Sequence, residues 1–161
     1  LNIDVTTHLN GFHGDTNRTF LIGNVSDDHK KLVEKTYESM MKGIQEIKPG
    51  ERLGNIGAAI QEFAEGHGYS VVRDFCGHGI GRGFHEEPQV LHYGERGTGT
   101  RMKAGMTFTV EPMINMGTYE LKILKDDWTA ITKDKLWSAQ FEHTILVTDD
   151  GFEILTIPDS D

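Results

Sequence analysis

The strongest constraint in this chain is a pair of carboxylates, Asp4 and Asp15, on two β-like segments that are joined by a turn around residues 8–11. If residues 8–11 form a four-residue loop, Asp4 lies directly opposite Asp15, with Cβ atoms about 4.5–5.5 Å apart. If Asn10-Gly11 forms a two-residue turn, Asp4 pairs with Asn17 and Asp15 becomes a diagonal neighbour. Like charges this close are destabilising unless something positive lies between them. Both registers bring the acids to one site, and two divalent metals about 3.5–4 Å apart would suit it.

Size and composition are those of one globular domain. The chain has 161 residues, of which 37% are hydrophobic and 25% charged. Its net charge of −9 argues against a nucleic-acid-binding surface. The lone cysteine, Cys76, excludes an internal disulfide and fits a reducing, cytoplasmic compartment. No apolar run approaches the ~18 residues of a membrane span. The chain begins at Leu1 with strand-like residues and no initiator Met, so we expect an N-terminal portion of the fold to be absent.

Hydrophobic periodicity predicts an α+β fold. Apolar residues follow helical spacing from a cap at Ser26 to about Lys48, and again from Leu53 to Glu65. Alternating segments predict strands at residues 1–7, 12–22, 69–74, 106–111, 118–124, 128–132, 139–148 and 152–157. The outline is a curved antiparallel sheet backed by two helices. Three histidines are interpreted as surface residues: His13, His29 and His67.

Two glutamates and a histidine extend the acidic pair. Strand alternation puts Glu111 and Glu142 on polar faces of otherwise apolar strands, and a buried carboxylate needs a partner. His78 lies between two glycines that leave its imidazole unobstructed. Four carboxylates match the charge of two divalent cations, and with one imidazole they suit Mn, Co, Fe(II) or Zn. Taken singly, each acid is more typical of a solvated turn or strand end, so the residues alone leave both interpretations open.

Longer motifs run through the same residues. They read NIDVT at 2–6, GFHGDT at 11–16, CGHGIGRGFHEEPQVLHY at 76–93, MTFTVEPM at 106–113 and SAQFEHT at 138–144. Together they strongly resemble type I methionine aminopeptidase over nearly the whole chain. The resemblance implies the pita-bread fold, with residues 1–161 as a single catalytic domain that forms the C-terminal portion of a pita-bread domain. It also implies a dinuclear metallo-hydrolase that removes the initiator methionine from nascent proteins when the second residue is small.

The resemblance assigns roles to individual residues. The metal ligands it implies are Asp4, Asp15, His78, Glu111 and Glu142. Glu111 also matches the residue that moves the proton of the attacking water, and His85 matches a histidine that binds the scissile amide and stabilises the intermediate. Phe84 and Trp128 resemble side chains that line the pocket for the methionine side chain. Positions that can hold a monovalent cation are matched by Asn2, Val5 and Ser138.

Other functions stay open at this point. Proline-specific peptidases (aminopeptidase P and prolidase) share the ligand types, although GFHEEP at residues 83–88 favours the methionine enzyme. The type II enzyme usually carries a helical insertion between the equivalents of His78 and Glu111, for which this chain has no room. A non-catalytic pita-bread binding module would lack several ligands, whereas all five are present.

The resemblance also implies binding partners and an N-terminal half that these residues do not include. The expected partners are nascent polypeptide N-termini near the ribosome, without direct contact to nucleic acid or membrane. Family members carry an N-terminal half with a second catalytic histidine and much of the methionine pocket. That half is missing from these residues, so the resemblance does not establish activity for this stretch by itself.

Overall fold

The computed structural model describes residues 1–157 and confirms the α+β class. In chain order the elements are β1 (Asn2–Leu9), β2 (Phe12–Thr19), α1 (Asp27–Ile44), α2 (Leu53–Gly66), β3 (Ser70–Val71), β4 (Gly77–Gly79), β5 (Glu86–Val90), β6 (Thr107–Val110), β7 (Met113–Asn115), β8 (Leu121–Ile123), β9 (Ala130–Thr132), β10 (Ser138–Gln140), β11 (His143–Val147) and β12 (Phe152–Ile154).

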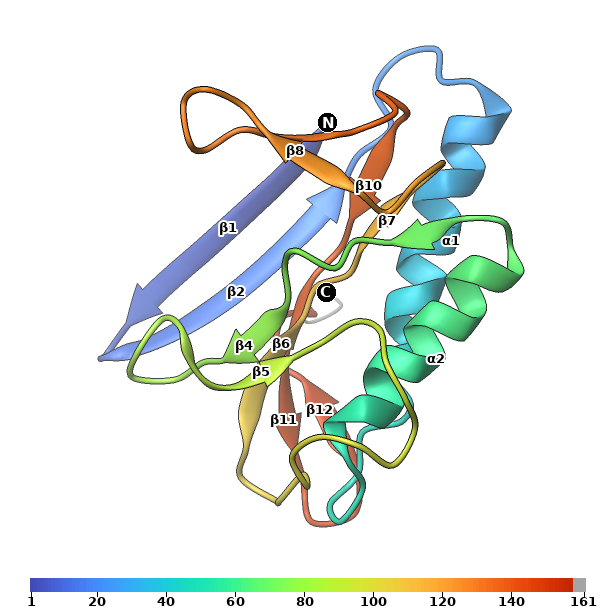
Figure 1. The fold of residues 1–161 in the computed structure, drawn as a ribbon. Coiled ribbons are helices and arrows are strands. Elements are labelled where there is room, and N and C mark those ends of the chain that lie inside the picture. Colours follow the sequence, from blue (N-terminus) through green and yellow to red (C-terminus); the bar gives the residue numbers. More distant parts are fainter. Residues whose placement is uncertain (158–161) are drawn as a thin grey trace.

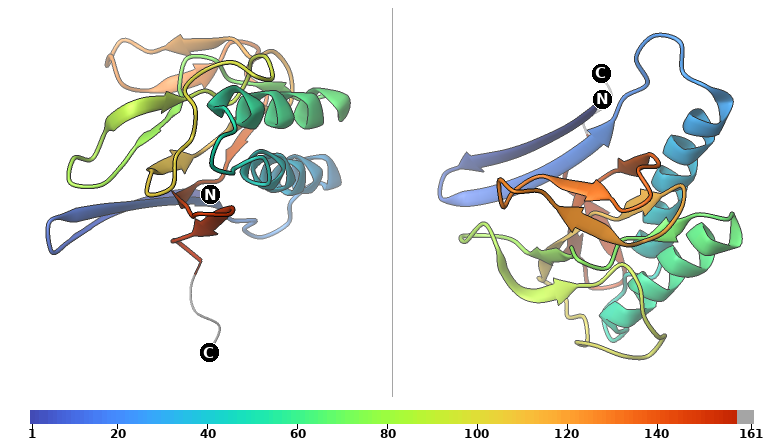
Figure 2. Two further views of the ribbon diagram at one scale, coloured as in Figure 1. Left: turned by 90° about the horizontal axis from the view of Figure 1, so that it is seen from below. Right: turned by 45° about the horizontal axis from the view of Figure 1, so that its top comes forward.

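The strands of residues 1–157 form four hydrogen-bonded sheets. The largest has the order β12-β11-β6-β4-β5, a three-stranded sheet has the order β10-β7-β3, and two pairs are formed by β1 with β2 and by β8 with β9. Figures 1 and 2 show α1 and α2 side by side along one side of these sheets, while β1 and β2 extend on the other side. A bridge between Asn17 and Glu142 joins β2 to the segment before β11.

The turn between β1 and β2 contains two residues, so the four-residue loop is wrong. Asn10 and Gly11 have φ angles of 52° and 83°. A type I′ turn needs these left-handed conformations at both positions, and the Asn-Gly pair adopts them readily. Asp4 therefore pairs with Asn17, and Asp15 lies diagonally across from Asp4 on the same face of the hairpin.

Two expected strands are divided by an interruption. The strand expected at 106–111 ends as β6 and is followed by β7, which sequence analysis missed, and the strand expected at 139–148 splits into β10 and β11. β6 pairs with β11 and β7 pairs with β10, and the register is the same on both sides of the interruption. Glu111 and Glu142 consequently lie opposite one another where the ladder is broken. The alternation of apolar and polar residues did not predict this interruption, because alternation assumes an unbroken strand.

The glycine-rich stretch contains two further strands that sequence analysis missed. β4 pairs with β5 on one side and with β6 on the other. Alternation could not reveal β4, because glycines have no side chains to alternate. Five other strands are shorter than expected: β2 replaces 12–22, β3 replaces 69–74, and β8, β9 and β12 replace 118–124, 128–132 and 152–157. β1 instead extends two residues beyond the expected 1–7.

Both expected helices form. Ser26 caps α1, and its side chain accepts a hydrogen bond from the His29 N–H at 3.4 Å. The helix ends at Ile44 rather than near Lys48. Pro49 accounts for Lys48 lying outside the helix, because it disfavours helical geometry in the residue before it. The second helix, α2, starts at the expected residue and ends one residue later than expected.

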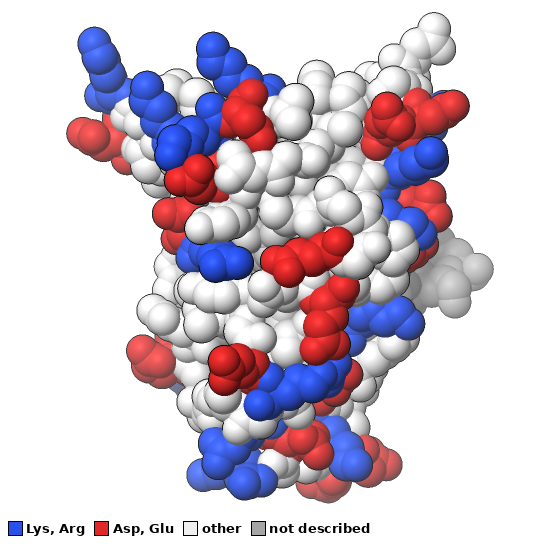
Figure 3. Space-filling model, turned by 45° about the vertical axis from the view of Figure 1, so that its right-hand side comes forward, with Lys and Arg blue, Asp and Glu red and all other residues white. Residues whose placement is uncertain are grey.

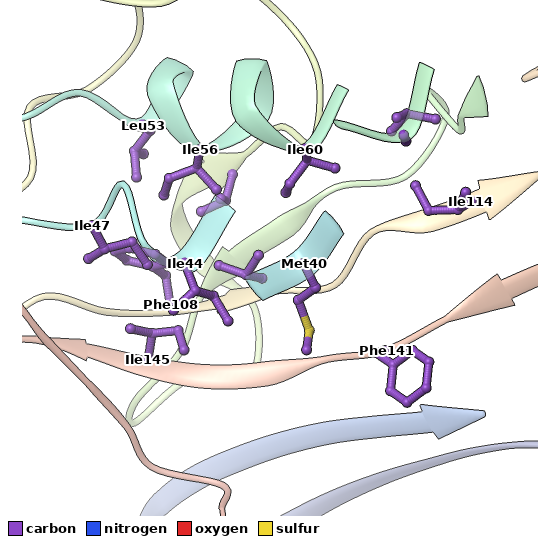
Figure 4. Close-up of a cluster of buried hydrophobic side chains, with 14 of the residues drawn as sticks. Met40, Ile44, Ile47, Leu53, Ile56, Ile60, Phe108, Ile114, Phe141 and Ile145 are labelled. Atoms are coloured by element: carbon purple, nitrogen blue, oxygen red, sulfur yellow. The ribbon is translucent and has the colours of Figure 1, made fainter. Parts of the chain in front are cut away.

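The helices anchor the strands that carry the two glutamates. Ile44, Ile56 and Ile60 project from α1 and α2 toward Phe108 of β6 and Ile145 of β11 (Figure 4). All five side chains are fully buried. Burying a side chain of this size contributes about 1.5–3 kcal/mol. This packing fixes β6 and β11 from the side opposite the hairpin.

Charges are mixed on the face that carries the helices. Figure 3 shows Lys and Arg side chains interspersed there with Asp and Glu side chains. The net charge of −9 is therefore not gathered into one acidic patch on this face. Within residues 1–157, no helix combines the length and apolarity that crossing a membrane requires.

Gly43→Ala is expected to destabilise the protein, because α1 and α2 approach closely at this residue. A Cβ at Gly43 would lie 2.6 Å from Cγ1 of the buried Ile60. We expect a loss of about 1–3 kcal/mol in the free energy of unfolding, measured by urea denaturation. Gly66→Ala is the control, because its Cβ would meet no atom within 4 Å. Equal stability of the two variants would contradict the close approach.

Candidate metal centre

The β1–β2 hairpin contributes two acids in different environments. Asp15 is buried, and its carboxylate accepts a hydrogen bond from Thr6 Oγ1 at 2.9 Å. The Asp15 N–H donates to Thr144 Oγ1 at 3.0 Å, and the same hydroxyl donates to the Asp15 carbonyl oxygen at 2.8 Å. Asp4 is exposed, and its carboxylate accepts from Asn17 Nδ2 at 3.0 Å. The hairpin thus holds one acid rigidly against β11 and the other at its surface.

His78 is presented by β4 between two neighbouring strands. A Cβ at Gly77 or Gly79 would overlap backbone atoms of those strands, so the glycines are needed for packing as well as for access. His78 Nδ1 lies 2.9 Å from the Gly79 carbonyl oxygen, which places the ring proton on Nδ1 and leaves Nε2 free. Nε2 lies 3.6 Å from Glu111 Oε1 and 4.0 Å from Asp15 Oδ2.

Glu111 and Glu142 lie outside the regular strand ladders and are held by individual hydrogen bonds. Glu111 Oε1 accepts a hydrogen bond from Thr109 Oγ1 at 2.7 Å. The Glu142 N–H donates to the Asn17 carbonyl oxygen at 2.9 Å, and the Asn17 N–H donates to the Glu142 carbonyl oxygen at 3.4 Å. Because the Asn17 side chain also bonds Asp4, this one residue links two candidate ligands.

Burial and mutual repulsion shift the pKa values of the cluster. Burial, then the charges of Asp15 and Asp4, raise the pKa of Glu111 to about 7. Burial and the charges of Glu111 and the two aspartates raise the pKa of Glu142 to about 10. Burial also raises the pKa of Asp15 and lowers that of His78, which keeps the imidazole neutral. Neutral imidazole is the form that binds metal ions.

A divalent cation fits this donor set. One ligand atom each from Asp15, His78 and Glu142 lie within 4.8 Å of one another. Glu142 Oε1 is buried and has no hydrogen-bond partner within residues 1–157. A buried polar atom of this kind calls for a partner. A cation would supply it and would favour the ionised carboxylates.

Two of the three expected substrate-binding residues lie beside this cluster. The His85 ring centroid is 4.3 Å from that of His78, and Phe84 stacks on His85 at 4.0 Å. Trp128 lies in the turn between β8 and β9 and is 87% exposed. His13 was expected at the surface, but it is half-buried and stacks with Phe84 at 5.8 Å. The physical reason is that His13 shares a hairpin face with Asp15, where alternation directs its ring inward.

The positions matched to a monovalent cation lie on β1 and β10. Asn2 Nδ2 donates to Asn17 Oδ1 at 2.6 Å and to the Gln140 carbonyl oxygen at 3.2 Å. Val5 is exposed on β1, and Ser138 begins β10. Their role as cation ligands stays a prediction.

Most of the chain matches one protein family. Residues 1–149 match the model of metallopeptidase family M24. The chain belongs to the M24 family. Membership in a metallopeptidase family agrees with divalent metal binding at the buried Asp, His and Glu cluster.

The M24 chain is similar to proteins named methionine aminopeptidase. It is 65% identical to methionine aminopeptidase B of Synechocystis over 98% of this chain and 57% of that protein. It is 55% identical to the Escherichia coli K12 methionine aminopeptidase over 100% of this chain and 61% of that protein. The chain thus spans about three fifths of the length of these curated relatives.

Solved structures support the expected fold. The crystal structure of methionine aminopeptidase from Rickettsia prowazekii matches with a TM-score of 0.95 and 58% identity, over 97% of this chain and 63% of that chain. Prolidase from Pyrococcus furiosus matches with a TM-score of 0.75 and 26% identity, over 99% of this chain and 41% of that chain. These matches confirm the pita-bread fold.

Four residues outside the expected site also contact the cluster: Asn17, His92, Thr109 and Gln140. Thr109 and Gln140 share polar strand faces with the two glutamates, so alternation already pointed to them. Asn17 was named as the partner of Asp4 in the two-residue register, but its second bond, to the segment before β11, needs the tertiary structure. His92 is fully buried, which lowers its pKa to about 3. Its Nε2 accepts a hydrogen bond from the Glu111 N–H. No local signal distinguishes it from the surface histidines.

The metal-free protein is expected to lose stability as the pH rises above 6.5. Folding raises the pKa of Glu111 and Glu142 from the ordinary 4.5 to about 7 and about 10. Above 4.5 the unfolded state releases protons that the folded state retains, so each raised pKa makes stability fall with pH until the folded pKa is passed. Buried histidines with a lowered pKa give the opposite slope below their ordinary 6.5, as His92 does. Glu142 therefore dominates the window from 6.5 to about 10.

Urea denaturation in EDTA at several pH values within this window measures the effect. Glu142→Gln should flatten the decline of unfolding free energy with pH. In a separate measurement without EDTA, saturating Mn²⁺ should flatten the decline of the wild type, because a cation favours the ionised carboxylate. Glu153→Gln, an exposed position in β12, is the control and should keep the wild-type slope. A wild-type slope in Glu142→Gln would contradict the raised pKa.

Proposed function

We propose that the natural protein is a methionyl aminopeptidase that removes the initiator methionine from nascent proteins when the second residue is small. The observation that supports this most is the 55–65% identity to proteins named methionine aminopeptidase over 98–100% of the chain. Two prolidases of the same fold reach only 25–26% identity. This difference favours the methionine enzyme over a proline-specific peptidase. The intact acidic cluster favours an enzyme over a binding module.

The metal content is part of the proposal. Two divalent ions, of Mn, Co, Fe or Zn, would be held by Asp4, Asp15, His78, Glu111 and Glu142. Four carboxylates balance the charge of two such ions, which supports the number. When bound, divalent ions lower the pKa of water and polarise a carbonyl group. A monovalent cation would be held through the oxygens of Asn2, Val5 and Ser138.

Side chains of the chain itself would move the proton and bind the substrate. Glu111 accepts the proton of the attacking water and returns it to the departing amine. The hydrogen bond from Thr109 at 2.7 Å keeps its carboxylate turned toward the cluster. His85 donates to the scissile amide and stabilises the charge that develops on its oxygen. Phe84 and Trp128 contribute to the pocket for the methionine side chain.

The partners follow from the same activity. We propose that the substrates are N-termini of nascent polypeptides, met in the cytoplasm near the ribosome. Direct contact with nucleic acid or membrane is not part of this proposal. The net charge of −9 supports that view for nucleic acid, since a phosphate backbone attracts basic surfaces.

Peptide specificity tests the proposed function. The full-length protein with Mn²⁺ should release methionine from Met-Gly-Ser and Met-Ala-Ser but spare Met-Lys-Ser and Met-Trp-Ser, because a small second residue is required. Free methionine is measured by liquid chromatography, and a Gly-Pro-Ser peptide serves as the control for proline specificity. Efficient release from the bulky pair, or cleavage of the proline peptide alone, would contradict the proposal.

Alanine substitutions should separate the roles of Glu111 and His85. Glu111→Ala should abolish turnover with the circular dichroism spectrum unchanged, because both a ligand and the proton acceptor are lost. His85→Ala should lower kcat by roughly 10²–10³ with the bound metal unchanged, because one hydrogen bond to the intermediate is lost. Metal content is measured by atomic emission. If His85→Ala lost as much bound metal as Glu111→Ala, His85 would be a metal ligand and its proposed role would be wrong.

A further inference from the structure

His92 contacts the candidate centre without being one of its proposed ligands. It lies two residues after β5 and is 2% exposed. Its Nε2 lies 3.0 Å from the backbone nitrogen of Glu111. Because the Glu111 N–H is the donor, His92 Nε2 is the acceptor and the ring proton resides on Nδ1. This bond ties the segment after β5 to the residue at which β6 ends.

Glu111 depends on side chains for its backbone hydrogen bonds. It lies in the interruption between β6 and β7, and Pro112 after it has no N–H to offer a neighbouring strand. Its carbonyl oxygen accepts from Gln140 Nε2 at 3.4 Å, and its N–H donates to His92. Buried backbone groups need partners, and here two side chains supply them in place of a ladder. The location of the Glu111 backbone is therefore set by Gln140 and His92.

We propose that His92 is a positioning residue for Glu111. As a fixed acceptor, it holds the Glu111 backbone so that the carboxylate stays 3.6 Å from His78 Nε2 and opposite Glu142. A ligand that is displaced by a fraction of an ångström binds metal less well, so groups that orient ligands affect metal affinity. The kinetic consequence rests on the proposed aminopeptidase activity, whereas the consequence for metal affinity does not.

A purely space-filling histidine would behave differently. In that case the volume of the side chain matters and its acceptor does not. His92→Phe keeps a buried aromatic ring and removes the acceptor. His92→Gln carries an amide oxygen near the position of Nε2 and keeps an acceptor. Val90→Ala is the matched control, because it removes fully buried methyl groups at the end of β5 and leaves the bond to Glu111 in place.

The test compares metal affinity and kinetics in the full-length protein. Mn²⁺ binding to the metal-free protein is measured by titration calorimetry, and kcat and KM are measured with Met-Ala-Ser. His92→Phe should bind Mn²⁺ about 10–100-fold more weakly and lower kcat by a similar factor, with little change in KM. His92→Gln should recover most of both losses, and Val90→Ala should bind Mn²⁺ like the wild type.

Three results would overturn the positioning role. They are wild-type Mn²⁺ affinity in His92→Phe, equal losses in His92→Phe and His92→Gln, and an equal loss in Val90→Ala. A wild type that binds Mn²⁺ but releases no methionine would refute the proposed function instead, and the binding comparison would still decide about His92.

A measurement on the wild type covers the case in which His92→Phe does not fold. Nitrogen NMR of the metal-free protein reports which imidazole nitrogen carries the proton. The proposal expects His92 Nε2 to be unprotonated and the Glu111 amide to be protected from hydrogen exchange. A proton on His92 Nε2, or rapid exchange of that amide, would overturn it.

Discussion

Repulsion between facing carboxylates is the constraint on which this structure depends. Glu111 and Glu142 lie opposite one another at an interruption shared by two strand pairs. Like charges directly opposite each other destabilise a sheet, and burial adds a desolvation penalty to each. Protonation relieves part of this penalty, because burial raises the pKa of both carboxyls and so favours their neutral forms. A divalent cation between the carboxylates would remove the penalty more completely and would couple metal binding to folding.

The rest of the molecule holds the strands in place against that repulsion. The helices pack on β6 and β11 through fully buried side chains such as Phe108 and Ile145. From the other side, the hairpin is fastened by the hydroxyl of Thr144, which bonds both backbone groups of Asp15. β4 brings His78 into the same space only because its flanking residues lack a Cβ. The cluster is therefore assembled from segments far apart in the sequence, each secured by different packing.

How much of this could be predicted from sequence depended on whether the signal was local. The helices and the hairpin were predictable, because apolar spacing, the Ser26 cap and the Asn-Gly turn are local signals. Three of the acids were recognisable from local sequence, since Asp4, Glu111 and Glu142 each directly follow an apolar residue of a strand-like segment, whereas Asp15 was recognised through its pairing with Asp4. Their relative placement was not, because the strand interruption depends on pairing between distant segments. His92 was missed for the same reason: its role is visible only in its hydrogen bond to Glu111.

The double attachment of Asn17 has a dynamic consequence. Its backbone pairs with Glu142 while its side chain holds Asp4, so fraying of β2 near this residue would release both contacts in one event. Local opening of this kind is a cooperative step with its own free energy. An ion held between the hairpin and the strand interruption would oppose that step by mass action. Departure of the ion and transient opening of the hairpin would then be kinetically linked, because both would require the hydrogen bonds of Asn17 to break.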